Sequence, residues 1–258
     1  MTTPPDHAGP PAPAPEPPPP HDGPSGGDEI GHTHADVSGG WLRAATFGAM
    51  DGLVTNVSLV AGIGAAGVSP NVVVTAGVAG AVAGAFSMAL GEYASVSTQN
   101  EAIDKEVAIE GREIRDNPRA EVRELAQMFR EMGMSEETAR AAAREVHTDH
   151  ERAVRVHVSH ELGLDPEEKA SPTVAALSSF VTFSIGAAVP LIPYLLGFAS
   201  LVGGLTVGGI GLLVAGGIAS LFTSTSWWWG AIRQLLYGGL AAGATYLVGT
   251  ALGVSVMT

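Results

Sequence analysis

Carboxylate and imidazole side chains recur at helical spacing between residues 97 and 170 of this 258-residue chain. The acids that share a helical face are Glu106, Glu110 and Glu113 in one stretch, and Glu121 and Glu124 in the next. His150, His157 and Glu161 form a further stripe, because spacings of seven and eleven residues are close to whole numbers of helical turns. Mixed oxygen and imidazole ligands suit Fe²⁺, Mn²⁺, Co²⁺ or Zn²⁺, so the segment is predicted to bind a divalent transition metal. The competing interpretation is that these glutamates form solvated helix faces that pair with neighbouring arginines.

A second set of candidate ligands lies in strongly apolar sequence. Asp51 and Glu92 interrupt apolar stretches, and ionisable groups in such surroundings are costly and usually functional. Met88 precedes Glu92 by four residues and therefore shares its helix face. A thioether beside two carboxylates favours a transition metal over Mg²⁺ or Ca²⁺. The alternative is that Asp51 caps a helix or pairs with Arg43, while Met88 only fills space.

The elements that carry these residues are predicted from three long runs without any Asp, Glu, Lys or Arg. The runs contain 40, 63 and 25 residues and cover 52–91, 170–232 and 234–258. Since a helix of about 20 apolar residues crosses a bilayer, the runs predict an all-α membrane protein with five transmembrane helices. These helices are expected over about 41–67, 72–90, 173–197, 200–222 and 230–254. Pro190 and Pro193 should kink the third helix, and glycine pairs in the fourth predict close helix packing.

The charged segment at 97–170 holds 11 of the 13 Lys and Arg residues and 18 of the 26 acids. The helical pattern of the second span continues past Glu92 into this segment without a breaker. Breaks at 117–118 and 133–135 divide the segment into helices predicted over about 95–116, 118–132 and 135–162. We therefore expect a three-helix cytoplasmic module, inserted between the second and third membrane helices. The resulting domains are 41–96 with two membrane helices, 97–170 with the module, and 171–258 with the other three membrane helices.

Residues 1–40 form a separate, Pro-rich acidic tail. It contains 11 of the 17 prolines and six acids but no Lys or Arg, a composition that predicts disorder. Four histidines lie in it. Of these, His32 and His34 either hold a metal weakly or belong to a solvated low-complexity segment.

The basic residues predict how the chain crosses the membrane. Arg43 precedes the first span, eleven Lys and Arg lie in the inserted segment, and Arg233 begins the fifth span. With five spans and the N-terminus inside, all 13 lie on one side, which the positive-inside rule assigns to the cytoplasm. We expect a multi-pass protein of the inner (plasma) membrane, with the N-terminus and the module cytoplasmic.

Composition excludes several classes of function. The chain has no cysteine, which removes disulfides, thiolate metal sites and cysteine nucleophiles. A net charge of −13 argues against a nucleic-acid partner. The charged segment lacks the Glu-x-x-His pattern of a ferritin-like di-iron oxidase, and outside the Pro-rich tail the chain has no Walker A loop or Gly-x-Ser-x-Gly elbow. The protein is therefore predicted not to be an enzyme and to have no resident cofactor.

Several short stretches, in order along the chain, resemble the vacuolar iron transporter family. They are 50–56 (Met-Asp-Gly-Leu-Val-Thr-Asn), 87–95 (Ser-Met-Ala-Leu-Gly-Glu-Tyr-Ala-Ser), 161–164 (Glu-Leu-Gly-Leu) and 190–194 (Pro-Leu-Ile-Pro-Tyr). These stretches match that family's first span, its second span, the end of its metal-binding domain and its third span. The resemblance covers about 41–256.

The resemblance implies a homodimer whose ion path runs between the subunits and is lined by the first two spans. It implies export of Fe²⁺ and related ions from the cytoplasm, coupled to protons. Carried over to this chain, it makes Asp51 and Met88 ligands of the pathway. It makes the following residues ligands of the module: Glu110, Glu113, Glu121, Glu124 and Glu161. His157 and Val158 stand where the family pattern has two adjacent methionines, so metal binding should be more pH-sensitive and the preference among Fe²⁺, Mn²⁺ and Zn²⁺ is open.

The sequence thus predicts a dimeric, proton-coupled transporter that exports Fe²⁺ or Mn²⁺ across the lipid bilayer. The alternative is a membrane-anchored metal-binding, buffering or sensing protein, in which the module holds iron and the spans serve only as an anchor. Asp51 and Met88 favour the transporter, because an anchor needs neither a buried carboxylate nor a thioether facing it. The sequence assigns no role to His147, His160 or the tail histidines, and it fixes no proton stoichiometry.

Overall fold

A computed structural model of the chain describes residues 40–163, 166, 169–198 and 200–256. In this part of the chain every regular element is a helix. The helices long and apolar enough to cross a membrane number five: α1 (Trp41–Ala65), α2 (Pro70–Asp116), α6 (Pro172–Ala188) with its continuation, α8 (Leu201–Ser220) and α9 (Trp227–Val256). The all-α membrane protein predicted from the charge-free runs is therefore confirmed. The predicted tail, except Gly40 at its end, lies outside the described residues.

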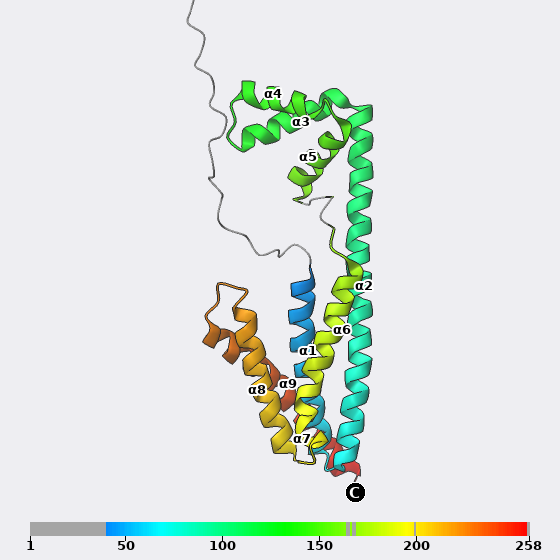
Figure 1. Cartoon of the computed structure of the whole chain (residues 1–258), viewed down its shortest axis with the longest axis vertical. Coiled ribbons are helices and arrows are strands. Elements are labelled where there is room, and N and C mark those ends of the chain that lie inside the picture. Colours follow the sequence, from blue (N-terminus) through cyan, green and yellow to red (C-terminus); the bar gives the residue numbers. More distant parts are fainter. Residues whose placement is uncertain (1–39, 164–165, 167–168, 199, 257–258) are drawn as a thin grey trace, which may run out of the picture. The chain divides into compact units, whose positions relative to one another are not determined.

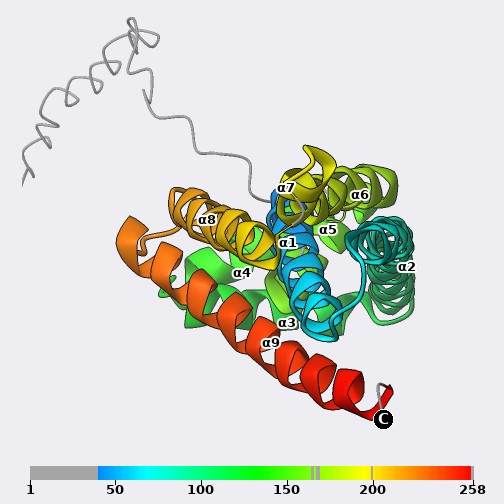
Figure 2. The ribbon, with the colours of Figure 1, turned by 90° about the horizontal axis from the view of Figure 1, so that it is seen from below.

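Helix α1 is the element around which the membrane helices assemble, since it contacts α2, α6, α8 and α9 (Figure 2). It packs closely against α6, and glycines make that approach possible. A Cβ atom on Gly52 of α1 would overlap the Phe183 carbonyl of α6, and one on Gly186 of α6 would overlap the Ala49 carbonyl of α1. Small residues at both positions let the two backbones touch, which is how helices commonly pack in a membrane.

Helix α8 uses its glycines in the same way, as its sequence predicted. Gly208 lies against the Val57 side chain of α1, and Gly216 lies against the Gly230 carbonyl of α9. Both glycines are buried.

The third membrane helix changes type where its two prolines lie. Helix α6 ends at Ala188, and the chain continues through the 3₁₀ turn η1 (Val189–Leu191) into the short helix α7 (Ile192–Leu195). Pro190 has no N–H to donate to an α-helical bond, so the backbone tightens instead of continuing as a regular α-helix. The irregularity predicted at Pro190 and Pro193 is found there.

Helix α2 is continuous over 47 residues, so the second membrane helix and the first helix of the charged segment are one element (Figure 1). At 1.5 Å per residue it is about 70 Å long, more than twice the thickness of a hydrocarbon core. Its charge-free part, 70–91, is long enough to cross a bilayer, and the charged remainder extends beyond it. The sequence predicted this continuity, because no helix-breaking residue separates the two parts, and the helix expected over 95–116 is the second half of α2.

The rest of the charged segment forms α3 (Pro118–Glu131), α4 (Glu136–Val146) and α5 (His150–Leu162). The single helix predicted over 135–162 is in fact two helices, with a turn at 147–149. Asp149 causes the break, because its Oδ1 accepts a hydrogen bond from the Arg152 backbone N–H (2.7 Å) and so caps α5. Thr148 Oγ1 donates to the Glu145 carbonyl (2.7 Å) and closes the end of α4.

Two small apolar clusters hold these helices together. One joins α3 to α4 through Leu125, Phe129 and the buried alanines of α4. The other joins the end of α2 to α5 through Ile114, Val154 and Val158. Val158 follows His157 directly, so the second cluster sets the position of the histidine.

Candidate metal centre

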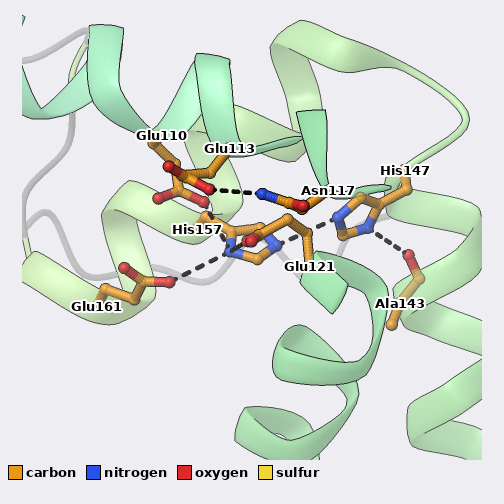
Figure 3. A network of polar contacts seen from close by, with 8 residues as sticks. All are labelled: Glu110, Glu113, Asn117, Glu121, Ala143, His147, His157 and Glu161. Atoms are coloured by element: carbon orange, nitrogen blue, oxygen red, sulfur yellow. Dashed lines mark hydrogen bonds and ion pairs between the residues drawn. The ribbon is translucent and has the colours of Figure 1, made fainter. Parts of the chain in front are cut away.

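His157 lies at the centre of a group of carboxylates contributed by three helices (Figure 3). Its side chain is fully buried. Its Nδ1 atom lies 3.0 Å from Oε1 of Glu110 in α2, 3.2 Å from Oε1 of Glu161 in α5, and 3.7 Å from Oε2 of Glu121 in α3. Glu110, His157 and Glu161 each offer one ligand atom, and these atoms all lie within 4.8 Å of one another. We refer to Glu110, Glu121, His157 and Glu161 as the His157 cluster.

The distances in the cluster are those of ligands around a shared cation. Two atoms that are each about 2.1 Å from an octahedral ion, at right angles, are about 3.0 Å apart. A single proton on Nδ1 cannot form hydrogen bonds to three carboxylates at once. Oε1 of Glu110 is buried and accepts no hydrogen bond from any described residue. A divalent cation would compensate that oxygen and the neighbouring charges together, so the cluster can bind a transition metal.

Burial and mutual repulsion raise the pKa of two of these acids. Burial is the larger cause for Glu110, whose pKa rises from 4.5 to about 7. Neighbouring carboxylates add to that rise: Glu161, Glu121, Glu124 and Glu113. Burial likewise raises the pKa of Glu121, and repulsion from Glu124 adds to it, while the His157 imidazole lowers it. Burial and repulsion thus disfavour the ionised forms of Glu110 and Glu121, and the charge of a divalent cation would offset both effects.

Two turns bring the three helices together. At the first, the chain passes from α2 into α3 around Asn117, whose Nδ2 donates to Oε2 of Glu113 (2.9 Å). This turn carries Glu121 back toward Glu110. The second is the turn at 147–149, which directs α5 along the end of α2 and so places His157 and Glu161 opposite Glu110.

A second histidine is connected to the cluster. Nε2 of His147, at the end of α4, lies 3.3 Å from Nε2 of His157, and the two rings meet edge to face. Nδ1 of His147 lies 2.8 Å from the Ala143 carbonyl oxygen. The sequence assigned no role to His147, because its partner lies ten residues away across a turn.

The other predicted residues of the module lie at the edge of the cluster or outside it. Glu113 is exposed and accepts the hydrogen bond from Asn117, and Glu124 is exposed on α3. Glu106 is half-buried on α2. His150 is exposed at the start of α5, where Arg115 Nη1 donates to its Nε2 (3.1 Å). The stripe predicted for His150, His157 and Glu161 therefore contributes only its last two residues to the cluster.

The predicted residues of the membrane helices lie apart from the cluster. Glu92 is buried and makes a two-pronged ion pair with Arg43 of α1, with Nη2–Oε2 at 2.9 Å and Nη1–Oε1 at 3.4 Å. Asp51 is half-buried on α1 and accepts a hydrogen bond from Thr55 Oγ1 (3.4 Å). Met88 is partly buried against the apolar cluster around Phe183. Arg43, an alternative partner of Asp51 in the sequence analysis, pairs with Glu92 instead.

One buried polar residue of the spans was not predicted as a site residue. Asn56 is fully buried on α1, and its Nδ2 donates to the carbonyls of Gly77 in α2 (3.2 Å) and Ala187 in α6 (2.6 Å). The sequence signal that could have identified Asn56 is a polar side chain in the middle of an apolar span. Its hydrogen bonds link α1, α2 and α6, so its place in the fold is structural.

Five apolar helices and a ligand cluster outside their apolar parts define a multi-pass membrane protein with side chains that can hold a metal ion. The profile of the VIT family matches residues 42–250, and the chain belongs to that family. The resemblance found in the sequence is thereby confirmed.

Individual relatives match most of the chain. A vacuolar iron transporter of Acanthamoeba castellanii is 33% identical over 226 residues, which cover 85% of this chain and 82% of that protein. The VIT-like transporter 1b of Glycine max is 31% identical over 222 residues, covering 84% of this chain and 78% of that protein. A vacuolar iron transporter of Centaurea cyanus is 26% identical over 216 residues, covering 83% of this chain and 88% of that protein.

Proposed function

We propose that this protein exports divalent metal, Fe²⁺ first and Mn²⁺ second, from the cytoplasm in exchange for protons. The observation that carries the proposal is the His157 cluster, which gathers three carboxylates and one imidazole on helices outside the apolar part of the spans. Similarity to vacuolar iron transporters supports iron as the substrate.

In this proposal the cluster captures the ion and the membrane helices carry it. Glu110 of the cluster and Met88 lie on the same continuous helix, 22 residues or about 33 Å apart. Glu110 would capture the ion about 27 Å along this helix from Glu92, where the proposed path starts before it passes Met88 and Asp51. Asp51 would ligate the ion and exchange protons, and Met88 would favour a transition metal over Mg²⁺.

The proposal places the path between two copies of the chain. In one copy, α2 leaves an apolar stripe exposed at helical spacing, formed by Val78, Val82, Phe86 and Leu90. This stripe lies on the helix that carries Met88, and a second copy would cover part of it. We propose a homodimer for this reason, with the module and the N-terminus on the cytoplasmic side of the cell's inner membrane.

Proton exchange provides the driving force. Moving a charge of +2 out against an inside-negative potential costs about 4.6 kcal/mol per 100 mV. Inward movement of two protons down the same potential would offset this cost, and a pH gradient would add to the drive.

Metal flux into proteoliposomes tests the proposal. We expect purified full-length protein to move Fe²⁺ (kept anaerobic) and Mn²⁺, and to do so faster with a pH gradient than without one. The D51N variant should lose transport, whereas D116N, the same change at an exposed position at the end of α2, should keep it. Equal flux with and without the gradient would refute proton coupling. Metal binding without any flux would instead favour the membrane-anchored buffer or sensor.

A further inference from the structure

A chain of hydrogen bonds leads from the backbone of α4 through His147 to Nε2 of His157 (Figure 3). It starts at the Ala143 carbonyl oxygen, 2.8 Å from Nδ1 of His147. A carbonyl oxygen only accepts hydrogen bonds, so Nδ1 of His147 carries a proton and donates it. In the neutral imidazole the other nitrogen, Nε2, is then an acceptor.

The tautomer of His147 fixes that of His157. The acceptor Nε2 of His147 faces Nε2 of His157 at 3.3 Å, so His157 is the donor in this contact. With its proton on Nε2, neutral His157 presents an unprotonated Nδ1. That atom faces Glu110 and Glu161, at 3.0 and 3.2 Å.

The local backbone holds His147 in place for this contact. Arg152 Nη2 donates to the Glu145 carbonyl (2.8 Å) and to Thr148 Oγ1 (2.6 Å), and thereby ties the start of α5 to the end of α4. His147 lies between these two helices as the first residue of the turn at 147–149. Its Nε2 is directed at the edge of the His157 ring opposite the carboxylates, so His147 is placed to orient the ligand and not to bind the same ion (Figure 3).

We propose that His147 is a positioning residue that selects the metal-binding tautomer of His157. Ligating histidines usually donate their second ring N–H to a fixed acceptor, and loss of that acceptor typically costs about 10–100-fold in metal affinity. Here the acceptor is another imidazole, itself fixed by a backbone carbonyl. The inference rests on the proposed role of the His157 cluster in binding metal, and it adds a residue outside the set of ligands.

Variants of His147 in the purified full-length protein test this, with Co²⁺ as the probe because its binding is visible in the absorption spectrum. H147Q places an amide oxygen near the position of Nε2 and should keep affinity within a few-fold of the wild type. H147F keeps the edge-to-face ring packing but has no acceptor, and it should lose about 10–100-fold in affinity. H147N retains a polar group near the Ala143 carbonyl but does not reach His157, so it should behave like H147F. H160F is the matched control, because His160 is exposed and its ring meets that of Phe129 edge to face.

The order of affinities decides the outcome. Rescue by glutamine but not by asparagine or phenylalanine, with unchanged Co²⁺ stoichiometry, is the expected result. If H147F binds as the wild type does, His147 only packs, and the proposal is refuted. A fall in the number of bound ions would refute it too, because His147 would then be a ligand. If H147F does not fold, as judged by its thermal transition without metal, the comparison of H147Q with H147N decides alone.

Binding and flux separate this proposal from the proposed transport function. The expected affinity order with no flux in any variant would support the role of His147 while contradicting transport. Normal flux with an affinity that does not depend on residue 147 would contradict only the role of His147.

Discussion

Replacing Glu110 by glutamine should make the metal-free protein more stable and its metal binding weaker. The pKa of Glu110 is raised from 4.5 to about 7, chiefly by burial, and its side chain is only 12% exposed. A difference of this size corresponds to about 3 kcal/mol of unfavourable free energy for the ionised carboxylate in the folded state. Glutamine keeps the shape of the side chain and removes this cost.

The pH dependence follows from the direction of the shift. Because the folded protein binds the Glu110 proton more tightly than the unfolded chain does, the destabilisation is absent below pH 4.5. It grows as the pH rises from 4.5 to 7 and is complete above pH 7. The advantage of E110Q should therefore be about 3 kcal/mol at pH 8 and at most about 1 kcal/mol at pH 5. Metal affinity should fall at least about tenfold, since a ligand is lost.

Thermal unfolding of the detergent-solubilised protein, with chelator present, measures the stability of the metal-free protein at pH 5 and pH 8. Titration with Co²⁺ measures the metal affinity. E101Q, the same change at an exposed position of α2, is the control and should alter neither property. A metal-free E110Q protein that is less stable than the wild type at pH 8 would refute the reasoning, because ionised Glu110 would then be stabilising without metal.

Three further predictions concern metal binding and the membrane helices. The Co²⁺ affinity of the wild type should fall about tenfold for each pH unit well below 7, because the ion displaces the Glu110 proton. An affinity that does not depend on pH between 5 and 7 would contradict this. R43Q should lower stability by about 1–2 kcal/mol by leaving Glu92 buried and unpaired, and R43Q/E92Q should recover part of it in the same thermal assay. G186A should lower the stability by about 1–3 kcal/mol, because the added Cβ forces α1 and α6 apart. G239A, where a Cβ meets open space, should not lower the stability. Equal effects of the two changes would argue against close packing of α1 and α6.

The membrane helices could be predicted from the sequence because their signal is local. A run of residues without charge is a property of the chain itself, and about 20 such residues must cross a bilayer or be buried. All five spans lie where these runs predicted them. Proline chemistry is equally local, which is why the irregular turn at Pro190 was predictable.

The helices of the charged segment were predicted less completely. No helix-breaking residue lies near residue 95, so the continuation of α2 into the charged segment was predictable. The break at 147–149 depends on the Asp149 side chain, which caps α5. Such a cap competes only weakly with helix formation, so the packing of α5 on α2 decides whether the helix breaks there.

Helical spacing identified the acids and histidines that share a face, but it could not tell which faces meet. Glu110, Glu121, His157 and Glu161 meet because two turns fold α3 and α5 back onto the end of α2. The same folding excludes His150, which pairs with Arg115, and brings in His147. Sequence alone thus determined the membrane helices, the family resemblance and the set of candidate ligands. The tertiary structure decided which of them converge, because contacts between helices depend on turn geometry and packing across distances that no local pattern records.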